Sequence, residues 1–338
     1  MIFGSLRHVF SPQGLKRLAG LGGACALMLG AGNTAFSQSA QDFPNRPIRI
    51  VYPFALGSSN DTVLRMIGDR LAEKWGQPVV IESKPGASSM IATSSVANAA
   101  PDGHTLLANI TLMLQNPALR SKLPYDPAAL VPVTQLNLQQ LPIYAHKDVP
   151  ANNLAEFIEL AKQQPGKLNF GSWGLGSTAH IILEQIKRTH NVDIVHVPYK
   201  GSTLVGVLGK EVDAGSGDFL APLQHFKSGT LKILAVTGAE RKPEFPDIPT
   251  LGESGVPGFD TYNWFGIYAP AGTPKEILQK ISDGIQEVQA DPELDRHFRE
   301  NFLVTPVKSS PEHFAEVNRV DGEKWRNVIK DTGITLEN

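Results

Sequence analysis

Three times along this chain, an apolar run leads into a loop of small residues and then into a segment with helical spacing. In the first unit, residues 48–52 are apolar on both faces, residues 54–61 form the loop, and apolar residues recur at helical spacing over 63–75. A run that is apolar on both faces indicates a strand buried in a parallel sheet. Repetition of strand, loop and helix predicts an α/β fold.

The other apolar patterns extend this order along the chain. We expect strands at residues 79–81, 105–108, 168–170, 194–197, 232–237 and 264–269, and helices at 90–99, 154–161, 181–186, 274–290 and 311–330. Helical crossovers between them predict parallel strands. We expect Ser59, Asn60 or Asp61 to cap the first helix, Pro311 to lie in the first turn of the last one, and residues 242–259 to form an ordered loop.

Residues 1–37 differ in character from the rest. Three basic residues and no acidic residue accompany an apolar stretch at 18–35, and Ala35 and Ser37 suit the −3 and −1 positions of a cleavage site. This pattern predicts a secretory signal peptide rather than an anchoring helix, and therefore a periplasmic protein. The only cysteine, Cys25, lies inside this segment, where its neighbours form a poor lipoprotein signal, so we do not expect lipid anchoring.

Composition limits the classes of protein to which the chain can belong. With 338 residues, 41% hydrophobic and 19% charged, it is long enough for two domains and can bury a core. Removal of the segment's three basic residues from the total of 31 leaves 28 basic against 33 acidic residues, a formal charge of −5. A negative mature chain argues against a nucleic-acid partner.

The loops are the places where binding is expected. We name residues 54–61 the first loop, 85–89 the second loop and 171–178 the third loop; each follows a strand and opens a helix. Ligands of open sheets bind at such positions, and unpaired N–H groups at helix starts favour anions. The candidate ligand-binding residues are Phe54, Ala55, Gly57, Ser58, Ser59, Asp61, Ser88, Ser172, Trp173, Ser177, Thr178 and Asp218. For Asp61 a helix-capping role, and for Trp173 a packing role, stay open as alternatives.

Other chemistry has weak support in the sequence. The third loop matches G-x-G-x-x-A from Gly174, but Asp193 precedes the next strand, whereas a ribose-binding acid follows it. The histidines lack H-E-x-x-H spacing and no G-x-S-x-G is present. We therefore expect no catalytic residue, no metal and no cofactor.

Several motifs together resemble the Bug-type substrate-binding proteins of tripartite tricarboxylate transporters. The resemblance runs from about residue 43 to the C-terminus. Its motifs include Pro44-Asn45-Arg46-Pro47, Ala100-Pro101-Asp102-Gly103-His104, Leu123-Pro124-Tyr125-Asp126, Pro165-Gly166-Lys167-Leu168, His196-Val197-Pro198-Tyr199-Lys200-Gly201, Asp247-Ile248-Pro249-Thr250 and Trp264-Phe265-Gly266. This chain departs from the family's pattern at Leu56, Ser58, Ser59, Asn60, Ser88, Ser89 and Trp173. In the family, glycine is usual at several of these loop positions, and a small residue is usual at the position of Trp173.

The resemblance implies a type II periplasmic-binding-protein fold with two Rossmann-like lobes and a ligand cleft between them. The first lobe would comprise residues 44–140 and 264–338, and the second residues 141–263. The resemblance also implies that the protein is a monomer that binds a small carboxylate. It would deliver this ligand to the membrane components of a transporter. A ligand-sensing subunit for a membrane receptor and, less favoured, an extracytoplasmic enzyme are the alternatives.

The loops also indicate the kind of carboxylate. Neither the first nor the third loop contains Lys or Arg, so oriented N–H and hydroxyl dipoles would hold the anion. Trp173 can supply a flat apolar wall and Asp218 can accept from a hydroxyl or ammonium group. We expect a compact mono- or dicarboxylate, aromatic or amino-bearing ones included, rather than a fully ionised tricarboxylate.

Overall fold

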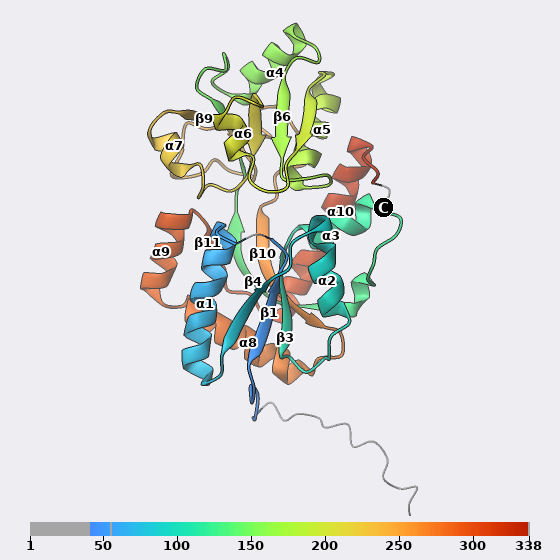
Figure 1. Ribbon diagram of the computed structural model, residues 1–338, viewed down its shortest axis with the longest axis vertical. Coiled ribbons are helices and arrows are strands. Elements are labelled where there is room, and N and C mark those ends of the chain that lie inside the picture. The colour runs from blue at the N-terminus through green and yellow to red at the C-terminus, as the bar shows by residue number, and fades with distance from the viewer. Residues whose placement is uncertain (1–40, 55, 337–338) are drawn as a thin grey trace, which may run out of the picture. The chain divides into compact units, whose positions relative to one another are not determined.

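The computed structural model describes residues 41–54 and 56–336, and its strands form two separate sheets (Figure 1). The first sheet, in spatial order β11-β4-β10-β3-β1-β2, consists of β1 (Ile48–Tyr52), β2 (Val79–Ser83), β3 (Thr105–Ile110), β4 (Leu130–Gln139), β10 (Asn263–Pro270) and β11 (Thr305–Pro306). The second sheet, in order β7-β6-β8-β5-β9, consists of β5 (Pro142–His146), β6 (Asn169–Ser172), β7 (Val195–Pro198), β8 (Ala214–Ser216) and β9 (Leu231–Val236). The predicted signal peptide, Cys25 and Ala55 lie outside the described residues.

Helices connect and cover the strands, so the predicted α/β class is confirmed. They are α1 (Ser59–Trp75), α2 (Met90–Ala97), α3 (Leu112–Leu119), α4 (Leu154–Gln163), α5 (Thr178–His190), α6 (Leu204–Leu208), α7 (Leu223–Lys227), α8 (Lys275–Gln289), α9 (Pro292–Phe302) and α10 (Pro311–Thr332). Pro311 occupies the first turn of α10 as expected, and residues 242–259 contain no helix or named strand.

The strands are not all parallel, which corrects one expectation. The strand β1 is parallel to β2 and β3, and β6 is parallel to β7 and β8, as the helical crossovers predict. In contrast, β10 is antiparallel to β3 and β4, and β5 is antiparallel to β8 and β9. The strands β10 and β5 arrive from the other sheet without a helical crossover, and only such a crossover forces parallel pairing. The two-residue strand β11, which follows α9, is also antiparallel to its neighbour β4.

Several elements in the middle of the chain were missed because of their prolines. Pro117 lies inside α3, Pro132 inside β4, and Pro142 begins β5. Proline is usually found at breaks and strand edges. The structure tolerates Pro132 because it pairs with Tyr268 at a register shift, where the ladder of hydrogen bonds is already interrupted. The apolar patterns also gave no sign of α9, of the short helices α6 and α7, or of strands β8 and β11.

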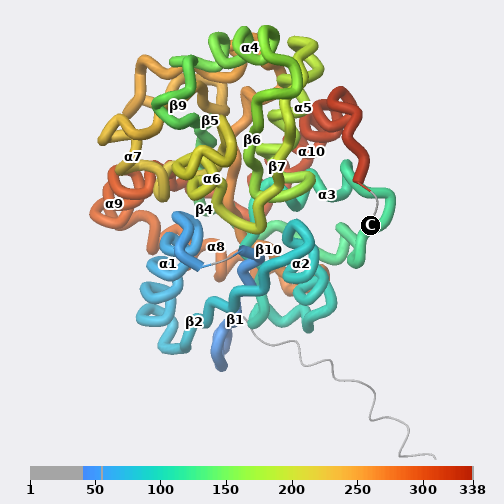
Figure 2. Tube along the Cα trace, turned by 45° about the horizontal axis from the view of Figure 1, so that its top comes forward, coloured from blue at the N-terminus to red at the C-terminus, as the bar shows by residue number. Residues whose placement is uncertain are grey.

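The helix α10 packs against both sheets' cores. Near its start, Phe314 meets Trp264 edge-on with ring centroids 5.1 Å apart, in a cluster that belongs to the first sheet. Further along, Trp325 lies in the core cluster of the second sheet and meets Phe259 edge-on at 6.1 Å. Both views place α10 beside α3 and α5 (Figures 1 and 2).

Three connections therefore join the sheets: the two residues 140–141 between β4 and β5, residues 237–262 between β9 and β10, and α10. Strand membership places 48–139, 263–270 and 305–306 in the first sheet and 142–236 in the second. The residue boundaries predicted for two lobes stay a prediction.

Candidate functional site

The first loop follows β1 and ends in the start of α1. Ser58 is the N-cap: its Oγ accepts from the Asp61 N–H at 3.3 Å, and the Asp61 carboxylate accepts in return from the Gly57 N–H at 2.8 Å. This reciprocal pair resembles a capping box. The expectation that Ser59, Asn60 or Asp61 caps the helix is wrong by one position, because the cap must precede the first helical residue, Ser59.

Asp61 is occupied on both carboxylate oxygens. Its Oδ2 takes the Gly57 N–H, and its Oδ1 accepts from Arg65 Nε at 3.0 Å along the helix. With both oxygens engaged, Asp61 supports the Ser58 cap, which favours a structural role for Asp61 over a ligand-binding role.

Beneath the cap lies Tyr52, which is not among the residues predicted to bind a ligand. Its hydroxyl is 2.6 Å from Ser58 Oγ, and its ring meets Phe54 edge-on at 5.4 Å. Burial raises the pKa of the Tyr52 hydroxyl above its ordinary value, and Asp61 and Asp218 raise it further. Tyr52 therefore stays protonated and holds the first loop on the end of β1.

The second loop has an unusual backbone. Ala87, Ser88 and Ser89 all have positive φ, at 47°, 50° and 73°. Left-handed backbone costs roughly 1 kcal/mol for each residue other than glycine. The Ser88 carbonyl accepts from Asn116 Nδ2 at 2.8 Å, and Ser88 Oγ donates to the Leu175 carbonyl of the third loop at 3.1 Å. The strained second loop thus contacts the third loop, which follows β6 of the second sheet.

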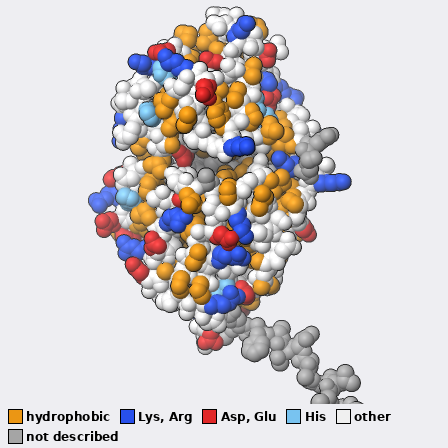
Figure 3. Space-filling model, viewed as in Figure 1, with side chains coloured by type: hydrophobic (Ala, Val, Ile, Leu, Met, Phe, Trp, Pro, Cys, Tyr) orange, Lys and Arg blue, Asp and Glu red, His pale blue; other side chains and the backbone are white. Residues whose placement is uncertain are grey.

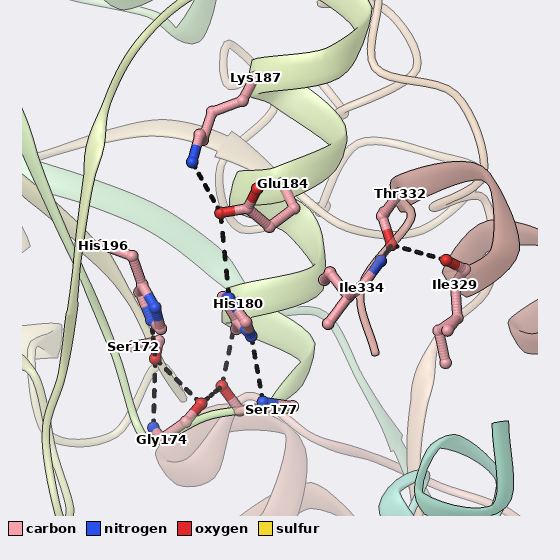
Figure 4. A network of polar contacts seen from close by, with 11 residues as sticks. Ser172, Gly174, Ser177, His180, Glu184, Lys187, His196, Ile329, Thr332 and Ile334 are labelled. Atoms are coloured by element: carbon pink, nitrogen blue, oxygen red, sulfur yellow. Dashed lines mark hydrogen bonds and ion pairs between the residues drawn. The ribbon is translucent and has the colours of Figure 1, made fainter. Parts of the chain in front are cut away.

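The third loop follows β6 and opens α5 (Figure 4). Ser177 is the N-cap of α5: its Oγ accepts from the His180 N–H at 3.3 Å and donates to the Gly174 carbonyl at 2.7 Å. Ser172 Oγ, at the end of β6, lies 2.6 Å from His196 Nε2. The predicted Ser172 and Ser177 are brought together within one hydrogen-bonded loop.

Two stacked histidines, His180 and His196, form hydrogen bonds with residues of the third loop. The rings of His180 and His196 are 4.1 Å apart and nearly parallel at 11°, and His180 Nδ1 accepts the Gly176 N–H at 3.1 Å. Burial lowers the pKa of each ring to about 4, with Lys187 lowering that of His180 and the facing ring lowering that of His196. Both rings are neutral at pH 7, which His180 needs in order to accept from Gly176.

Thr178 belongs to a polar cluster that joins the two sheets, which we call the threonine junction (Thr111, Gln115, Thr178 and Asn263). Thr178 Oγ1 accepts from Gln115 Nε2 at 3.0 Å and lies 3.3 Å from Asn263 Oδ1, which also accepts from Thr111 Oγ1 at 2.8 Å. All four residues are buried, and Thr178 is 0% exposed. Thr178 thus fastens the start of α5 to α3 and β10.

Asp218 follows β8 and faces the first loop. Its Oδ2 accepts from Ser59 Oγ at 3.1 Å, and its Oδ1 accepts from the Ala221 N–H at 3.4 Å. The Ser59–Asp218 bond joins the two sheets' loops, as does the Ser88–Leu175 bond. The structure therefore brings the first, second and third loops and Asp218 into one region.

The remaining candidate residues take no part in the hydrogen bonds between the loops. Trp173 is half-buried and packs partly against the core cluster of the second sheet, which favours its packing role. Gly57 takes a positive φ of 93° with open space beside it, so it permits the turn before the cap. Asp193 precedes β7, at the opposite end of the second sheet from the third loop, which disfavours dinucleotide binding.

Two surface hollows lie away from the loops. One of about 1140 Å³ is lined by Trp75, Val131, Pro132 and charged residues of α8; the other, of about 410 Å³, lies beside α4 and His190. The face in Figure 3 is recessed near its centre, and basic and acidic side chains are interspersed on it. The loop contacts, rather than the larger hollow, locate the candidate site.

Among residues 41–54 and 56–336, no group of three or more His, Cys, Asp or Glu is placed to hold a metal ion. Within the same ranges, no helix combines the length and the apolar character needed to cross a membrane.

Comparison with known proteins points to a single family. A family model described as "Tripartite tricarboxylate transporter family receptor" matches residues 63–334. A UPF0065 protein from Bordetella pertussis is 35% identical over 303 residues, which cover 89% of this chain and 94% of that protein. The protein BugT from the same organism is 32% identical over 304 residues, which cover 88% of this chain and 93% of that protein.

Solved structures agree. The structure described as R. palustris Rpa4515 with adipate has a TM-score of 0.81 at 32% identity, covering 88% of this chain and 100% of that one. MatC (Rpa3494) from Rhodopseudomonas palustris with bound malate has a TM-score of 0.77 at 31% identity, covering 85% and 100%. The periplasmic binding protein BugD has a TM-score of 0.79 at 30% identity, covering 88% and 100%. The predicted periplasmic-binding-protein fold is confirmed.

Proposed function

Because the chain belongs to the tripartite tricarboxylate transporter family receptors, we propose that it captures a small organic carboxylate in the periplasm and delivers it to the membrane components of such a transporter. The observation that carries this proposal is the meeting of loops from two sheets, through the Ser59–Asp218 and Ser88–Leu175 bonds. Two of these loops end in serine-capped helix starts, whose free N–H groups favour anions.

The carboxylates bound by related structures support the ligand class. One relative is described with adipate and another with malate, both small dicarboxylates. In this chain, the first and third loops contain no Lys or Arg, so dipoles rather than ion pairs would hold a carboxylate. We propose a compact mono- or dicarboxylate, with Ser58, Ser59, Ser88, Ser172, Ser177 and the adjoining N–H groups as its surroundings.

A thermal-shift screen tests the function. Purified protein lacking residues 1–37 is heated with a panel of mono-, di- and tricarboxylates, and any ligand that binds only the folded state raises the melting temperature. We expect small dicarboxylates to raise it at millimolar concentration and citrate to raise it less. A panel that leaves the melting temperature unchanged would overturn the proposal.

Two further parts of the proposal have their own tests. Export with cleavage near Ser37 predicts that periplasmic protein begins at about Gln38, which N-terminal sequencing determines. Capture between two lobes of a monomer predicts a smaller radius of gyration when ligand is bound, measured by X-ray scattering. Identical scattering curves with and without saturating ligand would contradict the closing motion alone.

A further inference from the structure

Asp218 is an acidic group without a counter-ion. Its carboxylate accepts from one hydroxyl and one backbone N–H, and among the described residues it makes no ion pair. Arg65 is a basic residue of the helix that follows the first loop, and its Nε is committed to Asp61. Each carboxylate oxygen has two lone-pair sites, so Asp218 keeps acceptor capacity.

The negative charge of Asp218 acts on a tyrosine hydroxyl of each sheet. It raises the pKa of the Tyr52 hydroxyl on β1 and of the Tyr144 hydroxyl on β5, in each case after the larger effect of burial. A Cβ on the preceding residue, Gly217, would lie 3.3 Å from the Tyr144 hydroxyl. The acid thus lies between the first loop, through its bond with Ser59, and the Tyr144 side chain of β5, and it is half-buried.

A second acceptor without a partner lies next to Ser59 in the chain. Asn60 is 8% exposed, and its Oδ1 is buried without a hydrogen-bond partner among the described residues. An amide carbonyl and a carboxylate are both acceptors, and an unsatisfied buried acceptor favours a donor group on a ligand. An amide oxygen and nitrogen can exchange places by rotation, whereas the charge of Asp218 cannot be exchanged.

The negative charge of Asp218 determines which hydrogen-bond donor on a ligand would bind next to it. A carboxylate ligand at the first and third loops would meet the negative charge of Asp218, which disfavours binding. An ammonium group on the same ligand turns that repulsion into a charge-assisted hydrogen bond, and it offers three donors. A neutral hydroxyl on the ligand would supply a donor but leave the repulsion in place.

Resting on the proposed function, we propose that Asp218 and Asn60 form an ammonium subsite, so that the protein prefers carboxylates that carry a protonated amino group. Ser59 fixes the orientation of the Asp218 carboxylate from the first loop, and Asp218 completes the subsite from the second sheet.

Matched ligand pairs test this preference in the unmodified protein. Calorimetry compares succinate with aspartate, glutarate with glutamate, and propionate with alanine at pH 7. We expect the amino-bearing member to bind at least about tenfold more tightly in at least one pair. Binding of the plain acids with equal or higher affinity in every pair would overturn the subsite while leaving carboxylate capture intact. Absence of binding by every acid, with or without an amino group, would overturn the proposed function as well.

A charge-neutral variant tests the residue. Asp218→Asn keeps an oxygen acceptor for Ser59 but removes the charge, and we expect it to abolish the preference within a pair while strengthening the plain acid. Asp148→Asn is the control: Asp148 is an exposed acid paired with Lys210 beyond the far end of β5, and its loss should change neither affinity. An unchanged affinity ratio in Asp218→Asn would count against the subsite, and the wild-type ratio remains decisive should that variant fold poorly.

Discussion

The two sheets are joined by hydrogen bonds of two kinds, and the threonine junction differs sharply from the loop contacts. At the junction, Thr178 and Asn263 are buried and each uses its side chain in more than one contact. The Ser59–Asp218 and Ser88–Leu175 bonds are single contacts, and in each of them at least one partner is partly exposed: Asp218 in the first, Ser88 and Leu175 in the second. A buried polar group that loses its partner costs far more than an exposed one, because water cannot replace the partner. The junction is thus suited to stay fixed, and the loop contacts to open and close.

Breaking the junction should have the largest effect on stability. Asn263→Leu removes the acceptor shared by Thr111 and Thr178 and leaves both hydroxyls buried. We expect the free energy of unfolding to fall by about 2–4 kcal/mol, measured by urea denaturation. Asn301→Leu on the exposed face of α9 is the control and should change it by less than about 0.5 kcal/mol. Equal effects of the two substitutions would remove the distinction between junction and surface.

Acid should lower the free energy of unfolding through the two stacked histidines next to the third loop, because the threonine junction contains no group that titrates. Folding lowers the pKa of His180 and of His196 to about 4, so between about pH 6.5 and 4 the unfolded chain binds more protons. The free energy of unfolding contributed by these rings is therefore present above pH 6.5 and lost as the pH falls towards 4. We expect a loss of about 3–4 kcal/mol, most of it from the buried His180, because solvent screening reduces the contribution of the partly exposed His196.

The variant His180→Asn isolates this contribution. Asparagine can still accept from Gly176 but does not titrate, so the difference in unfolding free energy between pH 7 and 4.5 should shrink relative to the wild type. Parallel pH profiles for the two proteins would show that other groups cause the acid sensitivity.

The loop contact at Ser59 should matter less for stability than for binding. Ser59→Ala removes the hydroxyl that reaches Asp218, and we expect unfolding free energy to fall by less than about 1 kcal/mol. Ligand affinity should change more than stability, since Asp218 loses its orientation. A stability loss as large as that of Asn263→Leu would place this contact in the same class as the junction.

The smallest net change is expected at Ser88. Glycine there relieves a left-handed φ of 50° but loses the bond to Leu175, and the two effects nearly cancel, to within about 0.5 kcal/mol. Ser88→Ala keeps the strained backbone and loses the bond, so it should be less stable than Ser88→Gly by about 1 kcal/mol. The reverse order in thermal melts would refute the strain assigned to this loop.

Local patterns were enough to predict the units β1–α1 and β6–α5, because each depends on neighbouring residues: an apolar run, small residues and a cap. The partners of the caps could not be predicted in the same way. Tyr52 looks like any core residue of a strand until its hydroxyl is placed against Ser58. Asn263 lies 152 residues from Thr111 and 85 from Thr178, and no pattern in either segment signals the pairing.

Prolines explain why α3, β4 and β5 were not predicted. In the local sequence, Pro117 and Pro132 argue against a helix and a strand, since a proline removes a backbone donor in any context. In β4 that donor is dispensable, because the ladder is already irregular opposite Tyr268. Such a compensation comes from a strand more than a hundred residues away, so local sequence could not reveal it. The segment that includes α3, β4 and β5, and with them one passage between the sheets, was lost in this way.

The three connections between the sheets also set limits in purely kinematic terms. Two rigid bodies held at two points keep one rotation, about the line through those points. A third tie away from that line removes the rotation unless the tie itself deforms. The helix α10 is the third tie, clamped by Phe314 at one end and Trp325 at the other, with Gly322 between them. Glycine is the weakest helix former after proline, so we expect the middle of α10 to be the part of this connection that bends most easily.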